Sequence, residues 1–497
     1  MGKKIFTLLF VLASLFSYTQ SLEDAFRLSS YFHNGSARFN SMGGAFGALG
    51  GDISSISINP AGSSVFIKSE VGFSVDITDK LVKNSFNNYF SESRSDFLSI
   101  NNVGAVLVYG NNKSKISIGY NMHNLNSFDT NFSFNGKTTA GLDNYFLFYS
   151  QDIPYEDLLV YDNETIQSVY EFLGDEYGYA DQQAFLGFQS FIINPNEDGS
   201  SYYSNAIYSS LEQHVDISRK GSHNMHTFNI SKSLKENFLI GLNINFHEIF
   251  YDELKTISEE GFDFNSKVNS ISFYDDLYTQ GIGTSLQIGS IFILKNLRIG
   301  LTYQSPTWFK LEDENIQSIR SDILEDDYII QYDINPNTVN YFEEYNFKAP
   351  SKSTISLAYV FGSRGLISVD YEHSRPSNSN FKDNNGSSSY LNNLNNLIDQ
   401  KFSKSSNSLR IGGEYRIKNY SLRVGTYKYE GILNDGDNNI SGISFGFGYN
   451  FGYFDIDIGY SKLNNKYSSN LLTNGLNSSY SSENLINSIY TSISIKL

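Results

Sequence analysis

The stretch ISFGFGYNFGYFDIDIGYS, residues 443–461, decides the fold. In its first half apolar residues alternate with serine, glycine and asparagine, and the alternation resumes after a short turn at residues 451–453. Asp455 and Asp457 occupy polar positions of the second half. Successive side chains of a strand point to opposite faces, so each half has one apolar and one polar face. A strand between lipid and a polar lumen needs this pattern.

The same alternation recurs upstream, for example in residues 297–304 and 409–417. Because chance alternation over so many segments is improbable, we predict an all-β fold, a transmembrane antiparallel β-barrel of about 14 strands within residues 64–497. The expected strands lie near residues 65–77, 100–110, 114–124, 222–233, 237–252, 278–295, 296–310, 345–361, 365–375, 407–418, 419–431, 440–452, 453–465 and 486–497.

The connections between these segments alternate in length. Tight turns follow the even-numbered strands, at residues 111–113, 235–237, 295–296, 362–364, 418–419 and 451–453. Longer loops are expected after the odd-numbered strands, and in the longest, at about residues 125–221, apolar spacing within residues 155–174 predicts one or two short helices over the mouth. Short periplasmic turns and long outer loops are typical of outer-membrane barrels. An even strand count places both chain ends on the periplasmic side.

The composition narrows the function further. Phe (39) and Tyr (36) far outnumber the single Trp, and membrane barrels use aromatic residues in girdles at both interfaces. A net charge of −17 argues against nucleic acid, because phosphate binding needs a basic surface. With no cysteine and only seven histidines, we expect no metal and no cofactor; His223 and His226 fall on opposite strand faces. No catalytic arrangement of side chains stands out, so we expect no enzyme.

The chain begins with a targeting signal. Lys3 and Lys4 precede an apolar run at residues 5–16 and then small residues, which predicts a signal peptide over residues 1–19. The run is shorter than the roughly 20 residues of a spanning helix. The expected location is therefore the bacterial outer membrane, crossed repeatedly by strands.

Residues 20–63 precede the first expected strand and lack its alternation. They contain the glycine-rich stretch 42–52, but no strand precedes it and no Lys-Ser or Lys-Thr follows it, as a nucleotide-binding loop would require. Glycines that permit close packing inside a barrel account for it better. We interpret residues 20–63 as an N-terminal hatch, or plug, inside the lumen.

This segment ends in Asn59, Pro60 and Ala61, and here the sequence resembles the FadL-type family of outer-membrane channels for long-chain fatty acids and other hydrophobic compounds. In that family an Asn-Pro-Ala motif ends a hatch that plugs a fourteen-stranded barrel. Residues 300–306, 370–372, 410–416 and 422–425 are also similar. The resemblance implies passive uptake of hydrophobic small molecules, fatty-acid-like or aromatic, with gating by the hatch.

The resemblance also implies lateral release into the bilayer through a kinked third strand, here at about residues 114–124, where Gly119 would relax the strand. A bound carboxylate would need an arginine, although arginines in a lumen often pair with neighbouring carboxylates instead. The lumen-facing candidates are Arg298, Arg410, Arg416 and Arg423. The candidates for an outer, apolar groove are Leu158, Leu159, Phe172, Phe185 and Phe188.

The expected partners are a hydrophobic small molecule, outer-membrane lipid and lipopolysaccharide, and the barrel is expected to be monomeric. Two alternatives stay open. A FadL-like barrel can act as a protein-interaction or shuttle component of type IX secretion. Similar chains are also described as haemin receptors, although the sequence carries no haem-ligating signature.

Overall fold

A computed structural model describes residues 20–497, apart from residues 31–32, 112–113, 198, 200, 384–387, 435–437, 473 and 477. The expected signal peptide, residues 1–19, lies outside the described residues, as does most of the expected turn at 111–113. Within the described part of the chain, no helix is long and apolar enough to cross a membrane.

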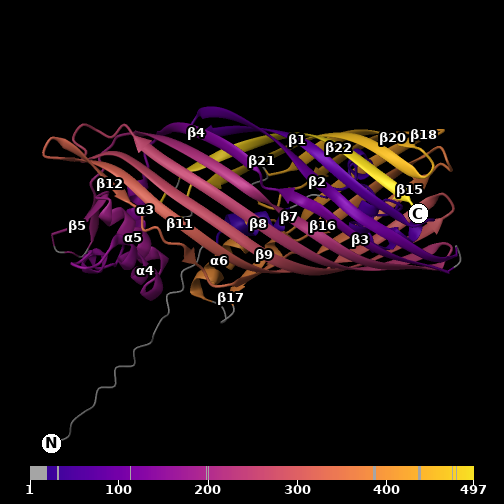
Figure 1. The fold of residues 1–497 in the computed structure, drawn as a ribbon, viewed down its shortest axis with the longest axis horizontal. Helices are drawn as coiled ribbons and strands as arrows, with labels where there is room; N and C mark the ends of the chain where they lie inside the picture. Colours follow the sequence, from indigo (N-terminus) through magenta and orange to yellow (C-terminus); the bar gives the residue numbers. More distant parts are fainter. Residues whose placement is uncertain are drawn as a thin grey trace, which may run out of the picture.

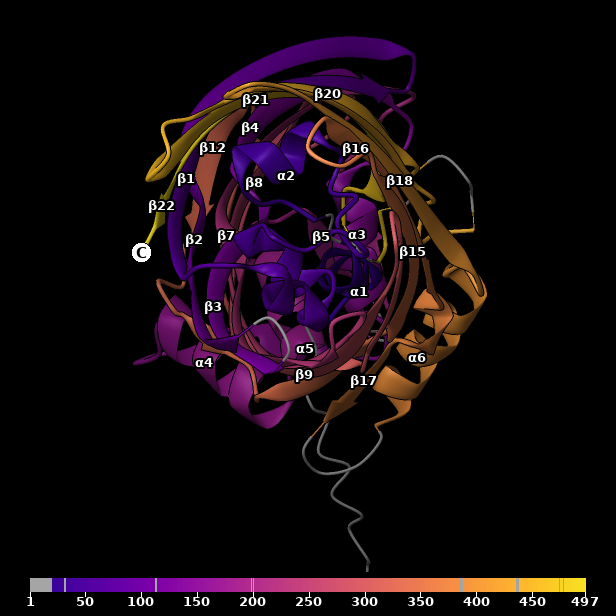
Figure 2. The ribbon, with the colours of Figure 1, turned by 90° about the vertical axis from the view of Figure 1, so that its right-hand side faces the viewer.

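One antiparallel sheet closes on itself to form the barrel (Figures 1 and 2). The wall strands are β1 (Glu70–Phe86), β2 (Tyr89–Asn111), β3 (Ser114–Ser127), β7 (Leu211–Lys235), β8 (Phe238–Glu260), β9 (Val268–Leu294), β10 (Leu297–Gln304), β11 (Thr307–Glu325), β14 (Tyr345–Ala349), β15 (Lys352–Val360), β16 (Gly365–Ser374), β18 (Ser406–Ile417), β19 (Tyr420–Tyr429), β20 (Ile440–Asn450), β21 (Phe454–Asn470) and β22 (Ser479–Lys496).

Two places in the wall are each filled by a broken strand. β10 and β11 are separated at Pro306, and both pair with β9; β14 and β15 are separated at Pro350 and pair with β11 and β10 respectively. Proline has no N–H to give to the ladder, which explains both breaks. β22 pairs with β1 and closes the ring. The wall therefore has fourteen places, which confirms the predicted fold class.

The outer face of the wall carries an apolar belt. Leu242, Ile282 and Ile355 are 54%, 65% and 55% exposed, and many other outward side chains are similar. Near the short turns the belt ends in packed aromatic rings, such as those of Tyr449 and Phe451. So large an apolar surface is stable only against lipid. The alternation in the sequence thus reflects a wall with lipid outside and polar groups inside.

The first two wall strands differ from the prediction. Residues 78–99 were expected to form a long loop, but β1 and β2 pair without interruption up to a tight turn at Asn87 and Asn88. Both turn residues have positive φ (46° and 69°), as such hairpin turns require. Beyond the membrane the outward positions of β2 become charged, at Glu92, Arg94 and Asp96. The apolar signal therefore fades while the pairing continues, and the expectation of a long loop was wrong.

A cap covers the extracellular end of the barrel (Figure 1). It comprises β4 (Thr130–Thr138), α3 (Leu142–Tyr149), η3 (Tyr155–Leu158), α4 (Ile166–Glu176), α5 (Tyr179–Gln189), β5 (Ile193–Pro195) and β6 (Tyr202–Ser204). Its buried residues form one core with the ends of the wall strands, for example Phe146 with Phe273. The remaining outer elements are β12 (Tyr328–Ile334), β13 (Asn340–Tyr341), η4 (Pro376–Asn378), β17 (Asn380–Asp383) and α6 (Ser389–Lys401).

The N-terminal segment lies inside the ring of strands (Figure 2). We call residues 20–69 the plug; its elements are α1 (Leu22–Ser29), α2 (Ala37–Ser41), η1 (Ile53–Ser57) and η2 (Pro60–Val65). Each element begins at a residue whose side chain accepts a hydrogen bond from its first turn, as helix caps do: Ser21, Ser36, Asp52 and Asn59. Local sequence therefore specifies these short helices, and the wall holds them in place.

Candidate functional site in the plugged lumen

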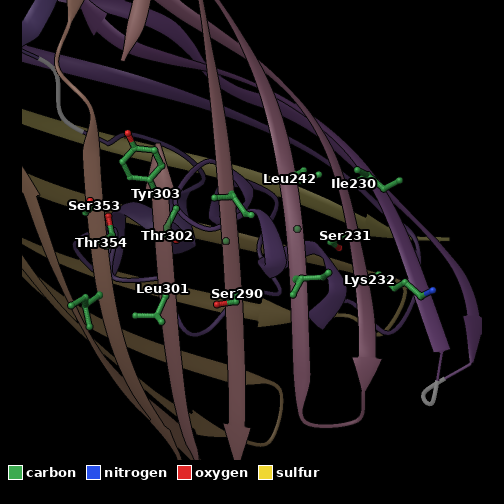
Figure 3. A pocket seen from close by; sticks show the side chains of 15 residues that line it. Ile230, Ser231, Lys232, Leu242, Ser290, Leu301, Thr302, Tyr303, Ser353 and Thr354 are labelled. Atoms are coloured by element: carbon green, nitrogen blue, oxygen red, sulfur yellow. The ribbon is translucent and has the colours of Figure 1, made fainter. Parts of the chain in front are cut away.

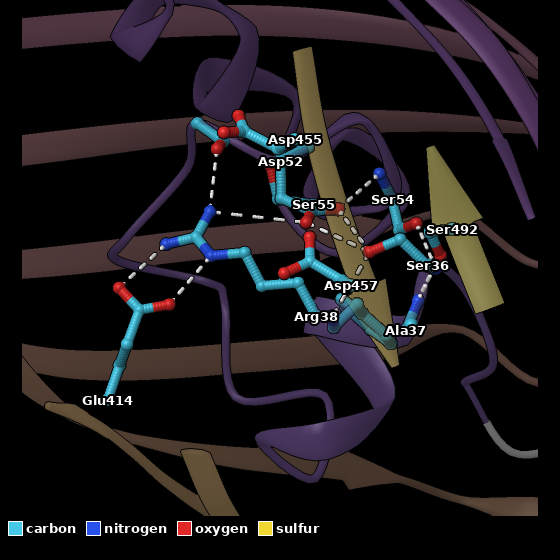
Figure 4. Close-up of polar contacts among 12 residues, drawn as sticks. Ser36, Ala37, Arg38, Asp52, Ser54, Ser55, Glu414, Asp455, Asp457 and Ser492 are labelled. Carbon is cyan, nitrogen blue, oxygen red and sulfur yellow. Dashed lines mark hydrogen bonds and ion pairs between the residues drawn. The ribbon is translucent and has the colours of Figure 1, made fainter. Parts of the chain in front are cut away.

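One side of the plug is held to the wall by buried ions. The Arg38 guanidinium donates from Nε to Glu414 on β18 at 2.9 Å (Figure 4). From Nη1 it donates to the carbonyl of Gly51 at 2.8 Å. Arg423 donates to the same carboxylate (2.6 Å) and to Asp457 (2.5 Å). Carboxylates beside it raise the pKa of Arg38 above its ordinary value, although burial acts the other way. Strands β18, β19 and β21 are thus tied through α2 of the plug.

A second ion cluster lies next to this one. His33 of the plug faces Glu372 on β16 at 3.1 Å, and Arg410 donates to the same carboxylate at 3.2 Å. Arg410 also lies 3.7 Å from Asp370, which accepts a hydrogen bond from the backbone N–H of Gly47 (3.0 Å). Burial is the main cause that lowers the pKa of His33 to about 4. His33 is therefore neutral at pH 7 and donates through an N–H.

The opposite side of the plug packs on the wall without charge. A Cβ on Gly241 would lie 2.4 Å from the carbonyl oxygen of Pro60, and one on Gly289 would lie 2.1 Å from the amide oxygen of Asn59. Only glycine allows the backbones to approach this closely. The Asn59 amide also donates to the carbonyl of Ser290 on β9 (3.0 Å). The Asn-Pro-Ala motif is therefore a docking contact with strands β8 and β9.

Wall amides complete this uncharged contact. Asn229, Asn243 and Gln287 donate to the carbonyls of Pro60 (2.9 Å), Ile56 (2.9 Å) and Ser57 (3.0 Å) respectively. Ile56 and Ser57 end η1, where carbonyls lack internal partners, so the bonds to these two carbonyls satisfy groups that would otherwise be buried unpaired.

A chamber of about 830 Å³ lies between the plug and the extracellular end of the wall. Helix α1 supplies one side, with Leu22 and Phe26, and strands β1, β3, β21 and β22 supply most of the rest. Apolar wall residues include Leu125, Phe128 and Ile486. A chamber of this size is large enough for a small-molecule ligand.

Polar groups occupy other parts of the chamber wall. Arg219 pairs with Glu253 at 2.5 Å, and the Arg27 guanidinium lies 3.6 Å from the centre of the Tyr251 ring and pairs with Asp24. These two arginines are balanced by carboxylates. Lys80 also lines the chamber, and no carboxylate among the described residues lies within 4.0 Å of its Nζ. Lys401 is the other chamber lysine without a carboxylate within 4.0 Å among the described residues. The chamber thus offers an apolar surface together with the two cations of Lys80 and Lys401, which suits an amphipathic ligand.

The four predicted arginines contact the plug or wall carboxylates. Arg298 donates to the carbonyl of Leu49 at 2.6 Å, and Arg416 pairs with Glu414. Arg410 and Arg423 belong to the ion clusters described above, and none of the four lines the chamber. Their geometry serves to hold the plug, and contact with a ligand stays a prediction. Sequence reasoning missed Arg38 and His33, for which the only signal was that few charged residues occur in residues 20–63.

The five predicted groove residues do not share one open surface. Leu158 and Phe185 are fully buried in the core of the cap, and Leu159 and Phe188 are half-buried. Phe172 is 54% exposed and packs edge-to-face on Tyr177. The cap is therefore tightly packed in this conformation, and an outer groove at these residues stays a prediction.

The third wall strand is paired on both sides over most of its length. β3 pairs with β2 from Ser114 to His123 and with β7 from Ile116 to Ser127, with one irregularity near Asn124. Pairing with β2 therefore ends four residues before the strand does, and lateral release at this strand stays a prediction. A Cβ on Gly119 would lie 3.0 Å from Ile56 of the plug, so this glycine serves close packing of the plug in the present conformation. Among the described residues, no three His, Cys, Asp or Glu side chains are placed to hold a metal ion together.

A closed wall of fourteen strands, an apolar belt and a plug in the lumen define the molecule as a plugged outer-membrane β-barrel. No family model matches the sequence, and no curated protein matches it either. Solved structures do match. A FadL homologue of Pseudomonas aeruginosa superposes with a TM-score of 0.53 at 11% identity, covering 94% of this chain and 99% of that one. The toluene transporter TodX of Pseudomonas putida gives 0.51 at 12% identity, covering 94% and 100%. The chain therefore has the fold of these channels.

Proposed function

We propose that this protein is an outer-membrane channel for passive uptake of hydrophobic small molecules, fatty-acid-like or aromatic, whose plug moves to let the ligand pass. The observation that carries the proposal is the chamber, which lies directly above a plug that fills the lumen. An apolar solute crosses the polar surface of the cell poorly but enters lipid readily, so a sheltered path past that surface is useful. The chemistry needed is binding and movement, without a catalytic group.

The two sides of the plug suggest which part moves. The side at β8 and β9 is fixed by glycine contacts and by hydrogen bonds from wall amides to backbone carbonyls of the plug, whereas the side at β16–β21 is held by ions. Ion pairs can be exchanged for water or a ligand anion, but a close backbone fit cannot be loosened gradually. We infer that the plug stays attached to the wall at η2 and tilts about this contact. The Arg38 side then moves away from the wall and opens a passage between them.

Reversible disulfides test this proposal, because the native chain has no cysteine. Ala37→Cys with Ser492→Cys would lock the ionic side, where the Ala37 N–H donates to the Ser492 hydroxyl at 2.6 Å. Ser63→Cys with Ser231→Cys would lock the uncharged side, where the two hydroxyls lie 2.5 Å apart. Uptake of oleate or toluene into liposomes containing the barrel is the measurement.

We expect oxidation to abolish uptake in the Ala37/Ser492 variant, and dithiothreitol to restore it. The Ser63/Ser231 variant is the matched control and should transport equally well in both states. Transport that is unchanged when the ionic side is locked would refute gating by the plug. Failure of the unmodified barrel to transport either probe would refute the channel itself.

One observation favours the shuttle alternative. Strand β12 pairs only with β11 among the described residues, and Tyr328 and Ile329 on it are 75% and 59% exposed. A free strand edge with apolar side chains is a template for an added strand from a partner. A photocrosslinker at Ile329 should capture a secreted protein if the shuttle role holds, while one at Tyr203 of the cap should not.

A further inference from the structure

A hollow of about 680 Å³ lies on the outer face of the wall, across strands β7, β8, β9, β10 and β15 (Figure 3). Its floor is a row of residues that are paired in register from strand to strand. The row runs Ser231, Gly241, Gly289, Thr302 and Thr354. The two glycines have no side chain, and the small side chains of Ser231, Thr302 and Thr354 point inward. The floor of the hollow is therefore bare backbone.

Two rows of outward side chains form the sides of the hollow. One contains Ile230, Leu242, Ile288, Tyr303 and Ser353, and the other contains Lys232, Ile240, Ser290, Leu301 and Ile355. The small side chain of Ser290 stands between larger apolar neighbours and deepens the centre. The hollow is thus almost entirely apolar, within the belt that faces lipid.

The plug lies directly behind this hollow. Helix η2 lies on the inner side of the same floor, where Ser63 meets Ser231, Pro60 meets Gly241 and Asn59 meets Gly289. Because the two glycines have no side chain, the backbone of the wall and the plug are in direct contact here. The Asn-Pro-Ala motif therefore supports, from the lumen, the same strip of wall that forms the floor of the hollow.

Lys232 identifies the ligand that fits. It points outward at the rim of the hollow, three residues before the short turn at Lys235, and no carboxylate among the described residues lies within 4.0 Å of it. Three residues of strand span about 10 Å, so Lys232 lies near the periplasmic membrane interface. A lysine at this depth attracts the phosphate of a lipid whose acyl chains lie along the wall.

We propose that this hollow binds one phospholipid of the periplasmic leaflet, with an acyl chain over the glycine floor and its phosphate at Lys232. A volume of about 680 Å³ falls within the roughly 300–1,000 Å³ of small-molecule sites. The site does not depend on the transport role, because it is complete on the outer face of the wall.

Native mass spectrometry of the full barrel, purified from membranes and exposed to mixed micelles of detergent and phosphatidylglycerol, tests the site. Lys232→Gln removes the phosphate contact, and Ile288→Trp fills the hollow. Lys418→Gln, at another periplasmic turn, and Ile411→Trp, at an outward position on β18, are the matched controls. We expect roughly fivefold weaker retention for Lys232→Gln and a larger loss for Ile288→Trp, with both controls unchanged.

Equal retention by all variants would overturn the proposal, and so would a retained molecule without a phosphate. If Ile288→Trp does not fold, the native barrel can be reconstituted in nanodiscs of phosphatidylglycerol that carries a diazirine in its acyl chain. Crosslinks should then be more frequent in residues 230–242 and 288–303 than at outward positions of residues 409–424. An even distribution around the wall would equally overturn a specific site.

Discussion

The two sides of the plug are held to the wall by different physics. On one side Arg38 and His33 meet the carboxylates of Glu414 and Glu372, which are buried and charged. On the other side η2 meets the backbone of Gly241 and its neighbours without charge. Buried ion pairs gain little net free energy but depend strongly on each partner. Close packing is insensitive to pH and salt but does not tolerate added atoms. We call the contact of η2 with β8 and β9 the fixed edge of the plug. We call the contact of Arg38 and His33 with Glu414 and Glu372 its releasable edge.

Adding atoms at the fixed edge should have the largest effect. In Gly289→Val the new side chain would overlap Asn59 and Pro60, where a Cβ already lies only 2.1 Å from the Asn59 amide oxygen. We expect plug docking to weaken by roughly 3 kcal/mol, because the wall cannot shift without losing its ladder. Limited proteolysis of the plug measures this. Gly413→Val is the control, since its nearest neighbour lies 3.8 Å away, and the idea fails if both variants behave alike.

Removing a charge at the releasable edge should have the next largest effect. Arg38→Met keeps an unbranched apolar stem but removes the guanidinium, and it leaves Glu414 with Arg423 and Arg416 alone. We expect a loss of about 2 to 3 kcal/mol in plug docking, at the lower end for a broken buried pair because two cations remain. Hydrogen exchange of α2 should rise while that of η2 stays protected.

The control for this change is Arg416→Met, which removes a 38% exposed partner of the same carboxylate. It should change exchange little. Equal exchange in α2 and η2 after Arg38→Met would show that the plug leaves as one body, which would contradict the distinction between the two edges.

The sequence predicted the wall better than it predicted these contacts. Alternation such as that in residues 443–461 reports directly on the two faces of a strand, so the strand number followed from its recurrence along the chain. The sidedness followed from the alternating lengths of the connections. The pairing of Arg38 with Glu414 joins residues 376 apart, and that of His33 with Glu372 joins residues 339 apart. Such contacts depend on register and on how the plug is turned in the lumen, and no local periodicity records either. The motif at Asn59 was recognisable, but its glycine partners on β8 and β9 were not.

Acidification should loosen only the releasable edge. The pKa of His33 falls from its ordinary 6.5 to about 4 in the docked plug. Between these values the released plug binds a proton that the docked plug does not, so docking weakens as the pH falls from about 7 toward 4. At pH 5 the loss is about 2 kcal/mol. His33→Gln should remove this slope in proteolysis measurements between pH 7 and 5, and an unchanged slope would assign it to another group.

The smallest effect is expected from the Asn59 side chain itself. Asn59→Ala removes the bond to Ser290, the cap on the Ala61 N–H (3.0 Å) and the bond to the Gly47 carbonyl (2.6 Å), but it leaves Pro60 against Gly241. Losing a helix cap or a neutral hydrogen bond costs about 1 kcal/mol when no water replaces it. At the opened edge of the plug, water can enter and bond to the freed groups, which reduces the total cost. We therefore expect a loss of about 1 kcal/mol, detectable as faster exchange in η2 with α2 unaffected. If Asn59→Ala instead released the plug as fully as Gly289→Val, the fixed edge would rest on its hydrogen bonds, and the glycine fit would be only their consequence.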